Sequence, residues 1–248
     1  MSGLRPIGIF DSGIGGLTVA RAIHDLLPDE SILYFGDTAH LPYGEKSPEL
    51  IQRYSTRIAS HLVKSGCKAI VVACNSASSN ALQAIISKVG PTIPVIDMVT
   101  PVVKALSQSL THSCQVGLIG TRATISSGLY NRCFKELSSN VELISKATPL
   151  LASAIEEGFF NDSIPQAVLD AYFTDDSFKT IDSIILGCTH YPLVKNEVRN
   201  LLPNGVNVID SPLIVAEELK SVLTEMGEQV VESNKKVKHH FQVSDLTE

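Results

Sequence analysis

Two short apolar stretches that end in a cysteine decide the fold: IVVACNS at residues 70–76 and IILGCTH at residues 184–190. Their cysteines, Cys74 and Cys188, lie 114 positions apart. A short continuous apolar run is typical of a strand that is buried on both faces of a parallel sheet. In both stretches polar residues follow the run directly. The match predicts two similar units in one chain, each built on such a sheet.

Two further matches occur in the same order and at nearly the same offset. The segment GIFDS at residues 8–12 resembles GLIGT at residues 117–121, and PVID at residues 94–97 resembles NVID at residues 207–210. Strand-like runs resemble one another by chance, so the inference depends on the order and the spacing. Together the matches predict two α/β units of about 110 residues, a size that suits a small domain.

The whole chain alternates between short apolar runs and longer amphipathic stretches. The predicted strands are Ile7–Phe10, Ile32–Phe35, Ala69–Ala73, Pro94–Asp97, Val116–Gly120, Val141–Ser145, Ser183–Leu186 and Val206–Asp210. The predicted helices between them include Leu17–Leu27, Pro48–Lys64, Ser78–Val89 and Ala123–Leu137. Strands separated by helices are typical of parallel sheets covered on both faces, so we predict an α/β protein.

Composition excludes several classes of protein. The 248 residues are 44% hydrophobic and 19% charged, which excludes a disordered chain. The net charge of −6 argues against nucleic acid as the main partner. No apolar run reaches the roughly 20 residues that span a bilayer, and residues 1–6 carry no signal-peptide core. We therefore expect a cytoplasmic protein without membrane contact. The polar tail from Gly227, with KKVKHH at residues 235–240, is expected to be a solvated terminal segment.

Cysteine usage argues against a disulfide framework. The five cysteines are an odd number and no pair has CxxC spacing, so a disulfide scaffold or a structural zinc site is not expected. We assign Cys67, Cys114 and Cys133 to packing or to the surface. Cys74 and Cys188 differ, because each follows a buried strand and precedes polar residues.

Ligands of parallel α/β sheets bind beyond the carboxyl ends of the strands. Four loops are expected there: Asp11–Gly16, Asp37–Gly44, Cys74–Ser79 and Gly187–Pro192. The glycines of the first loop suit an anion such as a carboxylate or a phosphate. A dinucleotide site is disfavoured, because Thr18 stands where GxGxxG requires its third glycine. From local sequence alone, Asp11 could equally cap the following helix.

The two cysteines suggest proton transfer. A thiol near a helix N-terminus is expected to become more acidic. One cysteine could be a nucleophile and the other incidental, or the two could form a redox pair. Only a pair of acid/base groups on opposite sides of one carbon explains why both units carry the same residue, and a racemase needs such a pair. No feature of the chain suggests pyridoxal phosphate or a metal, and no lysine suits a Schiff base, so no cofactor and no metal is expected. His190 could assist Cys188 or be purely structural.

At these residues the sequence resembles the bacterial glutamate racemases of the cofactor-independent aspartate/glutamate racemase superfamily. The resemblance runs from about Ile7 to Leu223. It is carried by GIFDSGIGGLTV at residues 8–19, YFGDTAHLPYG at residues 34–44, ACNSAS at residues 73–78 and LGCTHYPL at residues 186–193. The first two segments indicate the glutamate branch rather than the aspartate racemases.

The resemblance implies a set of site residues. Cys74 and Cys188 would be the catalytic acid/base pair, with Asp11 assisting near Cys74 and His190 near Cys188. The implied substrate contacts are Asp11, Ser12, Pro42, Tyr43, Gly44, Asn75, Ser76, Thr121, Thr189 and His190. The resemblance also implies glutamate as the substrate, D-glutamate supply for peptidoglycan (and so cell-wall biogenesis and cell shape), and a homodimer.

Two positions depart from the family pattern. Ser76 stands where the family usually has threonine, and it keeps the hydroxyl donor. Glu156 aligns best with the family's acidic residue, although the residues before it differ. A catalytic role for Glu156 and a surface carboxylate on a helix both remain open.

We expect two flavodoxin-like domains that face each other across the active site. The first would span residues 1–97 plus 210–248, and the second residues 98–209. Three alternatives to a glutamate racemase remain. A thiol hydrolase or amidase would depend on one nucleophilic cysteine. A two-lobed amino-acid-binding protein would bind without turnover. An aspartate racemase would differ in its substrate.

Overall fold

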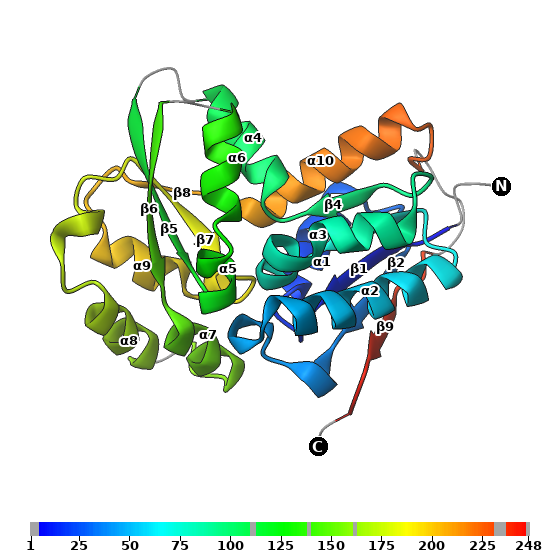
Figure 1. Ribbon diagram of the computed structural model, residues 1–248, viewed down its shortest axis with the longest axis horizontal. Coiled ribbons are helices and arrows are strands. Elements are labelled where there is room, and N and C mark those ends of the chain that lie inside the picture. Colours follow the sequence, from blue (N-terminus) through cyan, green and yellow to red (C-terminus); the bar gives the residue numbers. More distant parts are fainter. Residues whose placement is uncertain (1–4, 110–112, 138–139, 161–162, 231–236, 247–248) are drawn as a thin grey trace.

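The computed structural model describes residues 5–109, 113–137, 140–160, 163–230 and 237–246. Strands and helices alternate along the described chain, as Figure 1 shows. The strands are β1 Ile7–Asp11, β2 Ile32–Gly36, β3 Ala69–Val72, β4 Val95–Asp97, β5 Cys114–Gly120, β6 Val141–Ala147, β7 Ser183–Gly187, β8 Asn207–Val208 and β9 His240–Val243. The helices are α1 Leu17–Leu26, α2 Pro48–Lys64, α3 Asn75–Val89, α4 Thr100–Ser109, α5 Arg122–Ser126, α6 Leu129–Leu137, α7 Pro149–Glu156, α8 Ile164–Tyr172, α9 Lys195–Leu201 and α10 Ser211–Glu225.

The strands form two separate parallel sheets. One has the order β4-β3-β1-β2-β9 and the other the order β6-β5-β7-β8. Read from the opposite edge, the second sheet is β8-β7-β5-β6, which repeats the order of β4-β3-β1-β2. The predicted equivalences between β1 and β5, β3 and β7, and β4 and β8 are therefore present in the topology. The predicted α/β fold with two similar parallel sheets is confirmed.

The two sheets lie in separate lobes, at the right and left of Figure 1. We call the part built on β1–β4 and β9 the first lobe, and the part built on β5–β8 the second lobe. Alternate side chains of each strand enter the cores on opposite faces, because successive Cβ atoms point to opposite sides. In the first lobe, Ile9 packs in the core beneath α1 and α10, while Phe10 packs beneath α2 and α3. In the second lobe, Leu118 packs with α4 and α6, and Ile119 with α7, α8 and α9.

The last helix and the tail return to the first lobe. Helix α10 lies against α1, α4 and β4, and in Figure 1 it runs along the upper side of the first lobe. Strand β9 pairs with β2, from Leu33 opposite His240 to Gly36 opposite Val243. The exact domain boundaries, at residues 97/98 and 209/210, stay predictions.

Three sequence expectations need correction. The tail is not simply solvated, because β9 completes the edge of a sheet, although its four side chains are exposed. Residues 235–236 of the basic run lie outside the described residues. The helix expected over Ala123–Leu137 is divided into α5 and α6, because Gly128 adopts a left-handed backbone with φ of 65°. The last predicted strand of the second unit shortens to β8, which pairs only at two residues.

Candidate active site

A small cavity lies where the two lobes meet, at the carboxyl ends of the strands. Its volume is about 160 Å³, below the range of roughly 300–1,000 Å³ that drug-sized ligands require. The first lobe contributes the loops after β1, β2 and β3, and the second lobe contributes the loops after β5 and β7 and one face of α7. The cavity therefore suits one small molecule held between the lobes.

The structure brings nearly all of the predicted site residues together around this cavity. The predicted residues that line it are Ser12, Pro42, Tyr43, Gly44, Cys74, Asn75, Ser76, Thr121, Glu156, Cys188, Thr189 and His190. Gly13, Leu41, Ala152, Ser153 and Glu157 also line it and were not among the predicted site residues. Ala152 and Ser153 lie four and three residues before Glu156 on a helix, so the same face carries all three. That spacing is a signal that could have identified them.

Cys74 is placed by the junction of β3 and α3. It caps the N-terminus of α3, where its sulfur accepts from the backbone N–H of Ala77 at 3.5 Å. The thiol also donates to the hydroxyl of Ser12 at 3.6 Å. The expectation that this thiol would be unusually acidic is wrong. Burial, and then the nearby Asp11 carboxylate, outweigh the helix N-terminus and raise the pKa of Cys74 to about 12.

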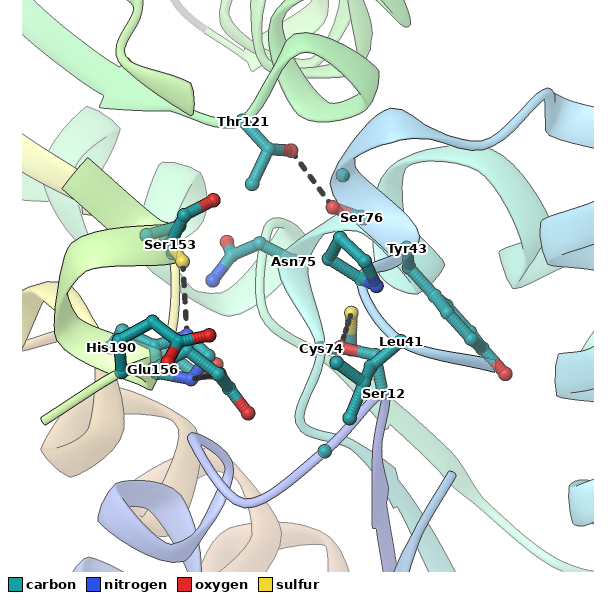
Figure 2. A pocket seen from close by; sticks show the side chains of 17 residues that line it. Ser12, Leu41, Tyr43, Cys74, Asn75, Ser76, Thr121, Ser153, Glu156 and His190 are labelled. Carbon is teal, nitrogen blue, oxygen red and sulfur yellow. Dashed lines mark hydrogen bonds and ion pairs between the residues drawn. The ribbon is translucent and has the colours of Figure 1, made fainter. Parts of the chain in front are cut away.

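Cys188 has a basic neighbour instead. It follows β7, and its sulfur lies 3.5 Å from Nδ1 of His190. On the other side of the ring, Nε2 of His190 forms an ion pair with the Glu156 carboxylate. Burial alone would lower the pKa of His190, but the contacts with Cys188 and Glu156 prevail and raise it to about 11. His190 is therefore a cation at neutral pH, held between a sulfur and a carboxylate (Figure 2).

The ion pair with His190 places Glu156 in the site. Glu156 ends α7 and reaches from the second lobe toward the first, where a Cβ added to Gly13 would lie 3.1 Å from its Oε1. The alternative that the sequence left open, a surface carboxylate on a helix, is not what the structure shows, because Glu156 pairs with buried His190 and lines the cavity. Its role in the chemistry stays a prediction.

Asp11 lies beneath the cavity, not in its lining. It ends β1, is fully buried, and accepts from the backbone N–H of Gly13 at 3.0 Å. The hydroxyl of Thr189, in the second lobe, donates to its other oxygen at 3.5 Å. Burial raises the pKa of Asp11, and the positive charge of His190 opposes that shift. Helix α1 begins after Gly16 without a side-chain cap among the described residues, so the alternative of a capping Asp11 is not observed.

The segment Pro42–Gly44 closes the cavity from the first lobe. The hydroxyl of Tyr43 donates to buried Asp37 at 2.5 Å, which fixes the ring. A Cβ added to Gly44 would lie 2.7 Å from Cβ of Thr121, so only glycine permits this approach of the two lobes. Figure 2 shows the neighbouring hydrogen bond between the hydroxyls of Ser76 and Thr121, at 2.8 Å.

The described residues show neither a metal-binding cluster nor a membrane span. Among these residues, no three or more His, Cys, Asp or Glu side chains are grouped so that they could hold a metal ion. None of the helices in the same part of the chain combines the length and the hydropathy that crossing a bilayer demands.

Sequence comparison places the chain near known racemases. The family model described as Asp/Glu/Hydantoin racemase matches residues 17–219. The glutamate racemase of Geobacter metallireducens is 40% identical over 245 residues, which are 98% of this chain and 88% of that protein. The glutamate racemase of Aquifex aeolicus is 46% identical over 222 residues, which are 89% of this chain and 84% of that protein.

Structural comparison leads to the same group. The chain is similar to the glutamate racemase of Francisella tularensis, which was solved in complex with D-glutamate. The TM-score is 0.91 at 37% sequence identity, and the match covers 100% of this chain and 90% of that one.

Proposed function

The chain belongs to the Asp/Glu/hydantoin racemase family, within its group of glutamate racemases, and we propose that it interconverts L- and D-glutamate through proton transfer by Cys74 and Cys188. Membership of this family makes it an isomerase. The choice of glutamate is supported by relatives of 40% and 46% identity that carry that name. The two-cysteine mechanism is supported by the geometry of the cavity.

One observation is the main support for the proposed mechanism. Cys74 and Cys188 follow the equivalent strands β3 and β7, come from opposite lobes, and line the same small cavity. A racemase must remove a proton from one face of a carbon and return one to the other face. Two acid/base groups related by pseudo-twofold symmetry accomplish this without moving the substrate.

The unequal surroundings of the two cysteines support different roles for them in the first step. The positively charged His190 lies 3.5 Å from the Cys188 sulfur, whereas burial and the nearby Asp11 raise the pKa of Cys74 to about 12 and keep that group a thiol. In this proposal Cys188 is therefore the base of the first step. The Cys188 thiolate takes the α-proton, the bond between that proton and the α-carbon breaks, and its electron pair stays on the substrate. The Cys74 thiol then gives its proton to the opposite face. The reaction leaves a thiol at Cys188 and a thiolate at Cys74, and the reverse reaction uses them in exchanged roles.

The α-proton of an amino acid is much less acidic than a thiol, and each unit of that pKa difference costs about 1.36 kcal/mol. The site must therefore stabilise the carbanion electrostatically. His190 supplies a fixed positive charge, and the buried hydroxyls of Ser76, Thr121 and Thr189 supply polar groups from both lobes. A cavity of about 160 Å³ leaves little room for water around these groups.

The biological setting belongs to the same proposal. D-Glutamate made by this chain would supply peptidoglycan synthesis, and with it cell-wall biogenesis and cell shape. We propose that the protein acts in the cytoplasm as a homodimer without a cofactor. Light scattering coupled to size-exclusion chromatography measures the oligomeric state directly, and a monomer at working concentration would exclude the dimer.

The function is tested by incubating reduced, folded protein with L-glutamate and no added cofactor, then measuring D-glutamate by chiral chromatography. Parallel reactions contain L-aspartate, or the variants Cys74→Ser and Cys188→Ser. We expect D-glutamate from the unmodified protein, little D-aspartate, and a loss of about 10³-fold or more in each variant. Turnover of aspartate alone would make the chain an aspartate racemase, and full activity in both variants would exclude the two-cysteine mechanism.

A further inference from the structure

The side-chain amide of Asn75 is buried in the cavity, and among the described residues only one of its two polar atoms has a hydrogen-bond partner. Asn75 follows Cys74 at the start of α3 and is 3% exposed. Its Oδ1 accepts a hydrogen bond of 2.9 Å from the hydroxyl of Tyr130. Its Nδ2 has no hydrogen-bond partner among the described residues. Because buried amide donors are rarely left unpaired, this NH₂ group is available to an acceptor on a bound molecule.

Figure 2 shows where the amide lies. The Asn75 side chain is directed into the space between Cys74 on one side and Ser153 and His190 of the second lobe on the other. An acceptor in the cavity can therefore reach Nδ2, whereas Oδ1 is already occupied by Tyr130.

Tyr130 is a rigid partner for this amide. It belongs to α6 of the second lobe, is 2% exposed, and packs in the core with Val116, Leu118 and Phe134. Burial raises the pKa of its hydroxyl far above the usual range, so the group remains a donor. Tyr130 does not line the cavity itself, so it can affect a ligand only through Asn75 or through the packing of α6.

We propose that Tyr130 is a positioning residue: its hydroxyl holds the Asn75 amide with the NH₂ group toward the substrate, where Asn75 donates to a carboxylate oxygen. This inference rests on the proposed function, because the carboxylate would be one of the two that glutamate carries. The two ends of an amide have nearly the same size, so shape alone does not select its orientation. Without the tyrosine hydroxyl the amide can rotate and present Oδ1, whose lone pairs repel a carboxylate.

The same contact joins the two lobes. Three residues of α3 bond to the second lobe: Asn75 to Tyr130, Ser76 to Thr121, and Asn80 to the carbonyl of Ala123 at 3.0 Å. The helix that Cys74 caps is therefore oriented by partners in the opposite lobe. Correct orientation of the amide depends on the lobes being in contact.

A double-mutant cycle tests the proposal in the full-length protein. The variants are Tyr130→Phe, Asn75→Ala and the pair combined, with Tyr172→Phe as the matched control. The Tyr172 hydroxyl accepts from the backbone N–H of Leu150 and lies outside the cavity lining. We expect Tyr130→Phe to raise the KM for glutamate about tenfold with a smaller change in kcat. The combined variant should match Asn75→Ala alone, and the control should match the unmodified protein.

Several outcomes would overturn the proposal. An unchanged KM in Tyr130→Phe would do so. A combined variant whose increase in KM equals the product of the two single increases would also do so, because Tyr130 and Asn75 would then act independently. If the unmodified protein binds glutamate without racemising it, the proposed function fails, but calorimetric Kd values for the same proteins still measure the coupling. If it binds no glutamate, both proposals fail.

A separate NMR measurement needs no tyrosine variant. The side-chain ¹⁵N–¹H signals of Asn75 should shift when glutamate is added, and unshifted signals would exclude a hydrogen bond donated by Asn75 to glutamate.

Discussion

Nδ1 of His190 lies 3.5 Å from the sulfur of Cys188, and this contact makes the two cysteines of the cavity electrostatically unequal. The neighbours of Cys74 are instead the hydroxyl of Ser12, the N–H of Ala77 and the negative charge of Asp11. A two-base racemase needs one thiolate and one thiol at the same moment. The positive charge of His190 beside Cys188 and the raised pKa of Cys74 make the two groups unequal in the direction that this mechanism needs.

Alkylation should distinguish the two thiols. At pH 8, a thiol whose pKa is about 12 has about one molecule in 10⁴ ionised, and thiolates are the reactive form. We therefore expect iodoacetamide to label Cys188 much faster than Cys74, as measured by peptide mass spectrometry. His190→Ala should slow the labelling of Cys188, since it removes the adjacent cation. Equal labelling rates of Cys74 and Cys188 in the unmodified protein would contradict the different roles proposed for the two cysteines.

Alanine substitutions at two glycines of the loop after β1 should affect activity to different degrees. A Cβ at Gly15 would lie 2.7 Å from both Cε1 of His190 and Oγ1 of Thr189, whereas a Cβ at Gly13 would lie 3.1 Å from Oε1 of Glu156. Gly15→Ala must displace His190, so we expect kcat to fall about 100-fold or more. Gly13→Ala meets the end of a flexible side chain and should cost much less.

Circular dichroism must show both glycine variants folded before their rates are compared. A Gly15→Ala variant that is folded and as active as Gly13→Ala would exclude the close fit between the loop after β1 and His190.

Alkaline pH should lower the free energy of unfolding, because buried Cys74 resists ionisation in the folded protein. Its pKa is about 12 in the folded protein and about 8.5 when unfolded. The stabilising contribution of the neutral thiol is therefore complete below about pH 8.5 and is lost as the pH rises toward about 12. Between pH 9 and 11 we expect the free energy of unfolding to fall about 2 kcal/mol further in the unmodified protein than in Cys74→Ala. Urea unfolding measures this difference, and Ser79→Ala serves as the buried, non-titrating control. Equal pH dependences in the unmodified protein and Cys74→Ala would show that Cys74 titrates normally.

The C-terminal strand should support the substrate loop. Beyond its pairing with β2, the tail bonds to the segment that leads to Pro42: the Ser244 hydroxyl accepts from the N–H of Ala39 at 2.9 Å, and the N–H of Asp245 donates to Thr38 at 3.1 Å. Deleting residues 237–248 should speed hydrogen exchange across residues 38–44 and raise the KM for glutamate. Ser244→Ala should have a smaller effect in the same direction. Unchanged hydrogen exchange across residues 38–44 in the deletion variant would show that this loop is stable without the C-terminal strand.

Buried strands and the loops that follow them were predictable from the sequence, because short continuous apolar runs that alternate with longer amphipathic stretches are typical of the buried strands of an α/β chain. The repeat around Cys74 and Cys188 even predicted which strands are equivalent. The pairing of β9 was not predictable, since its four side chains are exposed and the strand contains no continuous apolar run. The raised pKa of Cys74 was missed for a different reason. The sequence indicates the helix N-terminus, but burial and the carboxylate of Asp11 are set by the tertiary structure.

The measurement that tests the two-base mechanism most directly is proton NMR of L-glutamate incubated with the protein in D₂O, combined with chiral separation early in the reaction. The mechanism predicts that the α-proton signal decays and that deuterium enters the D-glutamate pool first, because the second cysteine delivers a solvent-derived deuteron to the opposite face. The remaining L-glutamate should keep its α-proton at that stage. Deuterium entering both pools at the same early rate would indicate a single base, and an undiminished α-proton signal in folded, reduced protein would contradict glutamate racemisation altogether.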